Sequence, residues 1–256
     1  MAEKRITWTS DITVEITGQY GDDERIARAA WVSSGKDPLG VREAEVRRVI
    51  RKLARDLHGT PFESGYLEAR IVAPRAVRDE HVRHRIGSYS SSSLRYRAEL
   101  VLQETPLSVD ALDWRDDEAS FYIPPAQRPL RKAAGHRQIR PQYTPLAFDD
   151  WVEYVRLIKH AIVNEVNSYN DIWRLCPSTE AVRWVTSDNL IVPYIARFNP
   201  RNLMAFIALR THNEDANHVS FPMWEIEQVA LQLENALREH WPITWEAFNT
   251  FGREAP

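Results

Sequence analysis

Apolar residues recur with helical spacing in two long stretches of the chain. In residues 41–57 they fall at i, i+3, i+4 and i+7, and Gly59 follows as the expected helix stop. This first stripe consists of Val46, Val49, Ile50, Leu53, Ala54 and Leu57. Residues 149–175 predict a longer helix with a buried stripe of Trp151, Tyr154, Val155, Ile158, Ala161 and Ile162. Shorter helices are predicted over residues 74–82, continuing towards Ile86, and over residues 202–209 and 223–238.

Strands are predicted at three places. Residues 66–72 alternate, with Leu67, Ala69 and Ile71 on one face, which is typical of a half-buried strand. Residues 120–123 and 189–198 predict two more, and Pro193 inside the last one favours an edge position or a bend. The polar, basic residues 126–146 are predicted to form a long loop. Few strands separated from long helices favour an α+β fold, and no shift in composition divides residues 1–256 into domains.

Composition excludes several classes of protein. The lone Cys176 leaves no disulfide framework and no multi-cysteine zinc site. No apolar run approaches the ~18 residues of a membrane span, and no apolar stretch follows the N-terminus as in a secretory signal, so a cytoplasmic protein is expected. A net charge of −3, from 33 basic and 36 acidic residues, argues against a general nucleic-acid binder.

Positive charge is nevertheless clustered in residues 78–97 and 128–140. Such clusters on an acidic chain suggest small anionic ligands, although ordinary solvated surface charge is an equally good interpretation. The glycine-rich fingerprints of dinucleotide and P-loop sites are missing, as are the zinc-protease and nucleophile-elbow motifs. His81 and His84 are spaced as a possible metal pair, but Arg83 and Arg85 beside them would repel a divalent cation. We therefore expect no metal site.

Residues 83–96 combine guanidinium groups with a run of hydroxyls. Arg83, His84 and Arg85 lead into Ser88 and four consecutive serines, and Arg95 closes the segment. Planar guanidinium forks beside hydroxyl donors suit the recognition of phosphate. An exposed, serine-rich linker is the alternative, and composition alone favours it slightly.

The same segment resembles the signature of the flavin-dependent thymidylate synthases, whose Arg-His-Arg is followed by serines and an Arg-Tyr pair, here Arg95-Tyr96. Further blocks similar to that family lie at residues 58–63, 73–77, 121–124, 199–204, 209–210 and 224–226. They occur in family order from about residue 28 to residue 248, with most spacings preserved.

The resemblance implies an α+β fold with a small antiparallel sheet and long helices, assembled as a homotetramer with FAD at subunit interfaces. Positions that contact flavin are Ser33, Thr60, Glu63, Arg83, His84, Arg85, Ile86, Asn199 and Arg201. Positions that contact the uracil nucleotide are Ser93, Leu94, Arg95, Arg183 and Arg210, to which the neighbouring substitutions Glu80 and Ser91 are added. Arg183 and Arg210 are the candidate catalytic residues, since a cation near the ring would stabilise negative charge developing there.

The implied reaction moves a methylene from methylenetetrahydrofolate to C5 of UMP or dUMP. A hydride from reduced FAD completes the methyl group, and NADPH reduces the flavin. The partners are then a nucleotide and a folate, with no nucleic acid and no membrane. Cys176 is not expected to act as a nucleophile, because the flavin route needs no protein thiol.

The chain departs from the family pattern on the nucleotide side. Ser90 and Ser91 stand where the family has Asn-Glu, and Glu80 stands where it has Gln. Ser64 and Ala205 replace a His and an Asn, and residues 211–223 form a polar insertion. Conserved chemistry with an altered sugar pocket resembles a branch that methylates UMP in nucleoside-antibiotic pathways. Two alternatives are a catalytically inactive flavin-binding relative and a binder of single-stranded RNA or uridine tracts that uses Tyr89, Tyr96 and the basic loop.

Overall fold

A computed structural model describes residues 6–32, 35, 42–93, 102–103, 105–115, 119–131 and 143–256, and only the backbone of residues 129–131 and 143–144. The chain divides into two compact units, each assembled from three separate stretches. The first contains Met1–Thr13, Val72–Glu80 and Ser91–Tyr194, and the second contains Val14–Ile71, His81–Ser90 and Ile195–Pro256. The single domain expected over residues 1–256 stays a prediction.

A three-stranded sheet begins the first unit. Strand β1 (Ile6–Thr9) lies between β5 (Leu112–Trp114) and β6 (Phe121–Tyr122) and pairs with both in parallel. The antiparallel arrangement implied by the resemblance is therefore wrong for this sheet. Parallel partners need a long crossover connection, and the chain between β1 and β5 is long enough to supply one.

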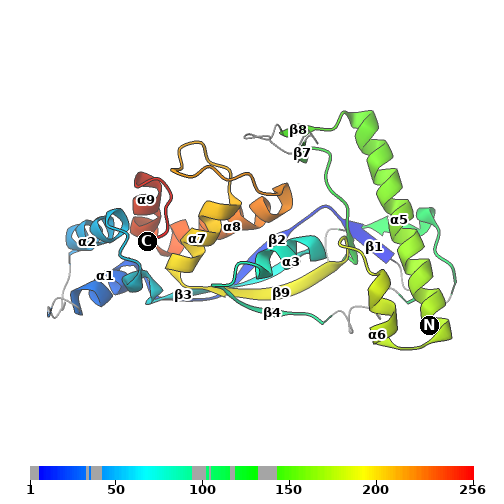
Figure 1. Ribbon diagram of the computed structural model, residues 1–256, viewed down its shortest axis with the longest axis horizontal. Coiled ribbons are helices and arrows are strands. Elements are labelled where there is room, and N and C mark those ends of the chain that lie inside the picture. Colours follow the sequence, from blue (N-terminus) through cyan, green and yellow to red (C-terminus); the bar gives the residue numbers. More distant parts are fainter. Residues whose placement is uncertain are drawn as a thin grey trace. The chain divides into compact units, whose positions relative to one another are not determined.

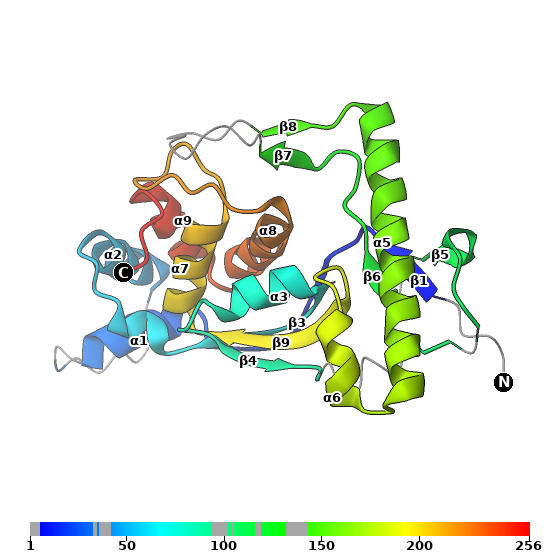
Figure 2. The ribbon, with the colours of Figure 1, turned by 45° about the vertical axis from the view of Figure 1, so that its right-hand side comes forward.

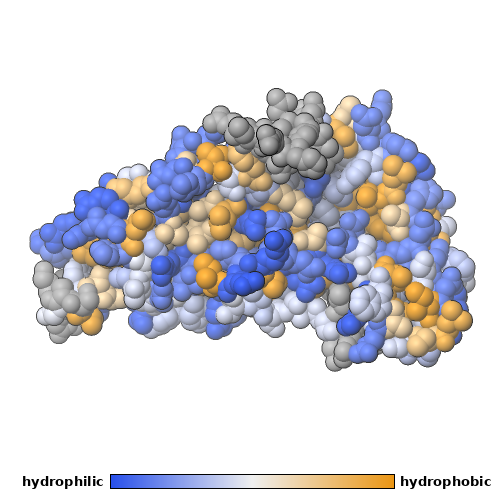
Figure 3. Space-filling model, in the orientation of Figure 1, coloured by the Kyte–Doolittle hydropathy of each residue, from blue (hydrophilic) through white to orange (hydrophobic). Residues whose placement is uncertain are grey.

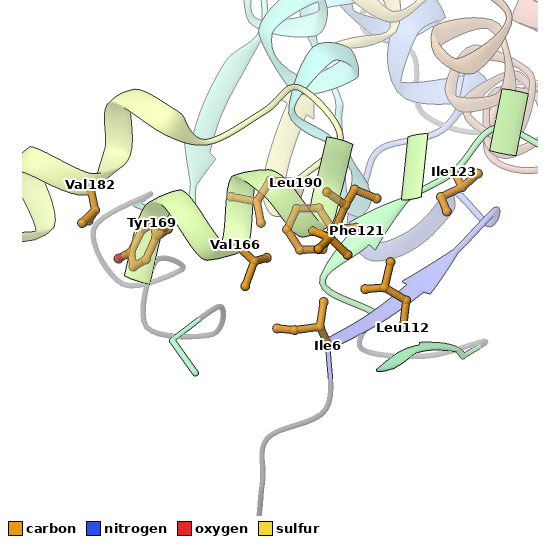
Figure 4. Packing of buried hydrophobic residues seen from close by; sticks show 10 residues of the cluster. Ile6, Leu112, Phe121, Ile123, Val166, Tyr169, Val182 and Leu190 are labelled. Atoms are coloured by element: carbon orange, nitrogen blue, oxygen red, sulfur yellow. The ribbon is translucent and has the colours of Figure 1, made fainter. Parts of the chain in front are cut away.

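Helix α5 (Phe148–Leu175) packs its C-terminal half on this sheet, as the side chains in Figure 4 show. Val166 and Tyr169 of α5 meet Ile6 and Phe121 in one apolar cluster, and each large side chain buried there contributes about 1.5–3 kcal/mol. The predicted helix is confirmed. Its predicted stripe is only partly right: Ala161 is exposed, and the fully buried positions are Ile162, Val163, Glu165, Val166, Tyr169 and Asn170.

The remainder of the first unit consists of short elements. A turn of 3-10 helix, η3 (Val109–Ala111), precedes β5, while α6 (Thr179–Val182) and η4 (Arg183–Val185) follow α5. Strands β7 (Pro129–Arg131) and β8 (Tyr143–Pro145) form an antiparallel ribbon. The predicted loop over residues 126–146 is thus wrong at both of its ends, and residues 132–142 lie outside the described part.

A four-stranded sheet has the order β2 (Thr13–Tyr20), β3 (Tyr66–Pro74), β9 (Ile191–Phe198) and β4 (Ser88–Ser91), and each of these strands contributes residues to both units. The predicted burial of Leu67, Ala69 and Ile71 on one face of β3 is confirmed. Strand β9 is interior, so the edge position expected for Pro193 is wrong. Pro193 lies near the start of the strand, and its carbonyl accepts a hydrogen bond from the Ser92 N–H at 3.0 Å.

Helices α7 (Pro200–Arg210) and α8 (Trp224–His240) lie on one side of β3 and β9 in both ribbon views (Figures 1 and 2). The other helical elements are α1 (Asp23–Val32), α2 (Glu43–Arg55), η1 (Thr60–Glu63), α3 (Arg75–Val82) and α9 (Pro242–Thr250). Within α3, the chain passes from the first unit to the second between Glu80 and His81. The predicted helices over residues 41–57, 74–82, 202–209 and 223–238 are confirmed within a few residues.

The end of α2 differs from its prediction. Leu57 is 51% exposed and left-handed (φ 54°), whereas Gly59 has an ordinary φ of −76°. The N–H groups of Leu57 and His58 donate to the carbonyls of Ala54 and Leu53, the pairing of a Schellman motif. Leu57 therefore follows the end of the helix and is exposed, so its predicted place in the buried stripe is wrong.

Polar residues cover much of the face seen in Figure 3, with apolar residues interspersed among them. Within the described residues, the helices are all too short or too polar to cross a membrane.

Candidate active site

The candidate site is built around the turn that follows α3 in the second unit. Backbone bonds from the His84 N–H to the His81 carbonyl (2.9 Å) and from the Gly87 N–H to the His84 carbonyl (3.2 Å) fold residues 83–87 into successive tight turns. The Tyr89 hydroxyl donates to the same His84 carbonyl at 2.9 Å. Three of the predicted flavin positions, Arg83, His84 and Arg85, are thereby held in one short turn, and Ile86 follows directly.

The two arginines of this turn project into solvent. Arg83 and Arg85 are exposed, while His84 between them is buried. Among the residues that the structure describes, no carboxylate pairs with either guanidinium. Two neighbouring cations without an internal counter-charge suit an anionic ligand, since each guanidinium presents a planar fork of donors.

A buried aromatic cluster lies beneath the turn. His81 is fully buried, with its ring 4.2 Å from that of Phe206 and 5.5 Å from that of Phe198, both nearly parallel to it. Tyr89 meets the His81 ring edge-on at 5.2 Å. Burial, helped by the charges of His84 and Arg210, lowers the pKa of His81 to about 3. His81 is therefore a neutral aromatic ring at physiological pH.

Arg210, at the end of α7, acts on the same cluster. Its positive charge lowers the pKa of both His81 and His84, although burial is the larger cause for each. Burial raises the pKa of the Tyr89 hydroxyl, and Arg210 partly offsets that rise. Arg210, a predicted nucleotide contact, thus acts electrostatically on His84, a predicted flavin contact.

The start of α7 is bonded directly to this turn. Asn199 caps the helix by accepting from the Asn202 N–H at 2.8 Å. The Asn202 side-chain amide donates to the Ile86 carbonyl at 2.6 Å, and the Asn202 carbonyl lies 3.4 Å from His84 Nε2. Because a carbonyl oxygen only accepts, this contact places the hydrogen of the neutral His84 ring on Nε2.

A second group of predicted flavin positions surrounds Arg201. Its guanidinium pairs with the Glu63 carboxylate at 2.6 Å and donates from Nε to the Pro256 carbonyl. Thr60 and Glu63 are both exposed on η1. A Cβ on Gly59 would lie 2.4 Å from Arg201 Nε and 2.4 Å from the Pro256 oxygen, so only glycine permits this close approach. Gly59 thus allows Arg201 to approach the backbone closely, and this contact holds a half-buried guanidinium beside the exposed residues Thr60 and Glu63.

The remaining substrate positions lie in the first unit. Arg183 is exposed with its guanidinium 5.3 Å from the centre of the Trp184 ring, and Ser91 accepts from Arg78 Nη1 at 3.4 Å. Glu80 is half-buried on α3, and Ser93 is exposed. The other predicted positions, Ser33, Leu94 and Arg95, lie outside the described residues, as does Tyr96.

The insertion over residues 211–223 is anchored to α8 and to the end of the chain. The His212 N–H donates to Glu227 at 2.7 Å, and its Nδ1 lies 2.9 Å from the Ser220 carbonyl. The Asn217 N–H donates to the Gly252 carbonyl at 2.9 Å. Both nitrogens of the His212 ring therefore have partners within the insertion, since Nε2 also lies 3.2 Å from the Glu214 carboxylate.

Sequence reasoning missed His81 as a component of the site, because its burial depends on Phe198 and Phe206, which lie more than a hundred positions further along the chain. No group of three potential metal ligands occurs in the part of the chain that the structure describes.

Known proteins resemble this chain over most of its length. Residues 15–243 match the family model described as thymidylate synthase complementing protein. The flavin-dependent thymidylate synthase of Streptomyces avermitilis is 32% identical over 258 residues, covering 98% of this chain and 96% of that protein. The enzyme of the same name from Streptomyces coelicolor is 31% identical over 264 residues, which cover 99% of this chain and 97% of that protein.

Solved structures extend the likeness to three dimensions. A crystal structure of the UMP/dUMP methylase PolB from Streptomyces cacaoi, bound with 5-Br UMP, superposes with a TM-score of 0.82 at 33% identity. The superposition covers 98% of this chain and 100% of the PolB chain. The same methylase bound with 5-Br dUMP also gives a TM-score of 0.82, at 31% identity.

Proposed function

Because this chain belongs to the flavin-dependent thymidylate synthase family and is a methyltransferase, we propose that it methylates C5 of a uracil nucleotide, UMP or dUMP, with FAD as its flavin. The observation that carries the proposal is the exposed pair of guanidinium groups, Arg83 and Arg85, on either side of His84, whose pKa the positive charge of Arg210 lowers. Both PolB structures hold a brominated uracil nucleotide, which supports that substrate class.

Arg83 and Arg85 are proposed to bind the pyrophosphate of FAD. The neutral ring of His84 keeps the turn in place through its contact with the Asn202 carbonyl. Arg201, held by Glu63 and Pro256, would lie along the cofactor beside Thr60, with Asn199 at the helix start. FAD, once reduced by NADPH, supplies the hydride that completes the methyl group, and methylenetetrahydrofolate supplies the carbon.

Arg183 and Arg210 are proposed to bind the nucleotide together with Glu80, Ser91, Ser93, Leu94 and Arg95. A guanidinium beside the uracil ring favours the negative charge that develops on it during transfer. Ser91 in place of a glutamate leaves space beside the sugar, and Glu80 could accept a hydrogen bond from a 2′-hydroxyl. If Glu80 makes that bond, UMP is preferred, whereas space alone would let both nucleotides react.

We extend the proposal to a cytoplasmic homotetramer in a pathway that modifies uracil nucleotides for nucleoside antibiotics. Light scattering on the purified protein tests the assembly. A tetramer is expected, because the resemblance places FAD where subunits meet.

The test is a methylation assay with FAD, methylenetetrahydrofolate and NADPH, in which UMP and dUMP compete and the products are separated by mass. We expect a methylated nucleotide and a saturable flavin signal. Arg85→Ala should weaken FAD binding about ten- to hundredfold, the loss of one charge-assisted contact of ~1.5–3 kcal/mol. Arg48→Ala removes an exposed arginine of α2 and should leave FAD binding unchanged.

The possible results separate the alternatives. Flavin binding without methylation of either nucleotide would identify a catalytically inactive relative. No saturable flavin binding would remove the basis of the proposal. A strict preference for dUMP that Ser91→Glu leaves unchanged would show that these substitutions do not act on the sugar.

A further inference from the structure

We propose that Glu165 is a positioning residue whose buried carboxylate fixes the turn carrying Arg183, and so sets how tightly the uracil nucleotide binds. The inference rests on the proposed function, in which Arg183 contacts that nucleotide. It adds a residue that lies on α5, far from every motif of the sequence analysis, and all of its contacts lie within the first unit.

Glu165 occupies an unusual position for an acidic side chain. The residue is only 9% exposed, and it lies on the face of α5 that also carries Ile162, Val166 and Tyr169. Oε1 accepts a hydrogen bond from the Ser187 N–H at 2.9 Å. Oε2 is buried, and no hydrogen-bond partner is found for it among the described residues. Burying a carboxyl group in apolar surroundings is costly, so stability alone does not explain the choice of glutamate.

The hydrogen bond to Ser187 anchors the turn of η4 from one side. Within that turn, the Thr186 hydroxyl donates to the Arg183 carbonyl at 2.8 Å, which ties Thr186 to the residue of interest. Ser187 is the next residue, and its backbone is fixed by Glu165. The path from Glu165 to Arg183 is therefore two hydrogen bonds, joined through the two consecutive residues Ser187 and Thr186.

Arg75 holds the same turn from α3. Its Nη1 donates to the Thr186 carbonyl at 3.0 Å and lies 3.3 Å from the Thr186 hydroxyl. The Ala76 N–H donates to the Asp188 carbonyl at 3.2 Å. The turn is thus bonded on two sides, while the Arg183 guanidinium itself is left exposed to meet a ligand.

The groups that hold the turn also influence the pKa of Glu165. Burial raises the pKa of Glu165, whereas the hydrogen bonds from Ser187 and the positive charge of Arg75 lower it, and Asp188 raises it. The same cation that bonds to Thr186 therefore also attracts the carboxylate that bonds to Ser187. Loss of the carboxylate would leave the Ser187 N–H without its acceptor and free the turn to move.

The experiment measures the Kd of UMP by calorimetry on the FAD-loaded enzyme. Glu165→Ala is expected to weaken nucleotide binding about tenfold, because a small displacement of a positioned group is costly, and to leave the Kd of FAD unchanged. Glu165→Gln should restore most of the affinity, since its amide oxygen still accepts from the Ser187 N–H. Glu165→Asp keeps the charge but shortens the reach, so it should behave like the alanine variant.

A matched control comes from the same helix. Asn170 is also buried on α5, and its Oδ1 accepts from the Gln103 N–H at 2.8 Å, away from the η4 turn. Asn170→Ala should lower the melting temperature as Glu165→Ala does, without weakening UMP binding. If both variants weaken binding equally, the role of Glu165 is only structural and the inference is overturned.

Combining substitutions tests whether Glu165 acts through Arg183. In the background of Arg183→Ala, the further change Glu165→Ala should add nothing to the Kd of UMP. Additive losses would overturn the inference, and so would wild-type affinity in both Glu165→Ala and Glu165→Asp. A wild-type protein that binds neither UMP nor dUMP would instead refute the proposed function. Should Glu165→Ala fail to fold, the Kd of UMP for Glu165→Asp is compared with that for Glu165→Gln. Weaker binding by the aspartate variant supports the inference, and equal binding overturns it.

Discussion

Replacing His81 by phenylalanine is expected to change how the stability of the protein depends on pH. The ring of His81 is fully buried between Phe198 and Phe206, so its charged form is excluded from the native state. Its pKa is about 3 in the folded protein, against an ordinary value of 6.5. Between these values the unfolded chain binds a proton that the native state does not. Stability therefore rises with pH across this window and is lost as the pH falls below 6.5.

The size of the effect follows from the two pKa values. Each pH unit inside the window is worth about 1.36 kcal/mol for one proton. Integrated from pH 7 to pH 5, the loss attributable to His81 is about 2 kcal/mol of unfolding free energy. A phenylalanine keeps an aromatic ring of similar size at this position and carries no proton, so the loss should disappear.

The assay is urea unfolding at pH values between 5 and 8. The difference in unfolding free energy between wild type and His81→Phe should shift by about 2 kcal/mol from pH 7 to pH 5, in favour of the variant. Parallel curves for His81→Phe and wild type would mean that His81 is protonated in the folded protein, which would refute the reasoning.

Three further outcomes are expected. Cys176→Ala should retain most of the methylation activity, because this exposed thiol follows the end of α5 and the proposed route uses no protein nucleophile. Gly59→Ala should weaken FAD binding in a fluorescence titration, since a Cβ there would displace Arg201. Arg253→Met should lower the unfolding free energy by about 3–5 kcal/mol in urea, because it leaves the carboxylate of Glu234, paired at 2.7 Å, without its buried partner.

Elements with a regular apolar pattern over many residues could be predicted from sequence. Elements whose formation depends on residues far away in the chain could not. Helix α5 and strand β3 follow directly from spacing. Helix α9, which was not predicted, is short, and its first N–H groups are satisfied from elsewhere. The Asp23 carboxylate accepts from the Ile243 N–H at 2.7 Å and from the Thr244 N–H at 3.0 Å. A helix start capped by a residue more than two hundred positions away has no local signature.

In the candidate site, too, the local motifs could be predicted from sequence, whereas contacts between distant segments could not. The family-like motifs assign Arg83 to Ile86 and Asn199 to flavin contact, and in the structure Asn202 bonds to both Ile86 and Asn199. Spacing alone could not show that the charge of Arg210 lowers the pKa of His81 and His84, since that depends on how α7 packs. Nor could it show the role of Glu165, which lies within a helix whose other buried positions are largely apolar.

His81 and His84 illustrate why residue type and spacing leave chemistry undecided. By spacing they form a possible metal pair, and the argument against it was repulsion by Arg83 and Arg85. The structure adds a stronger reason, because the His81 ring is packed against Phe206 and His84 Nε2 faces the Asn202 carbonyl. Burial lowers the pKa of both rings, so neither adds positive charge at neutral pH. The cationic character of the turn then comes from guanidinium groups alone, which stay protonated at any pH where the protein is folded.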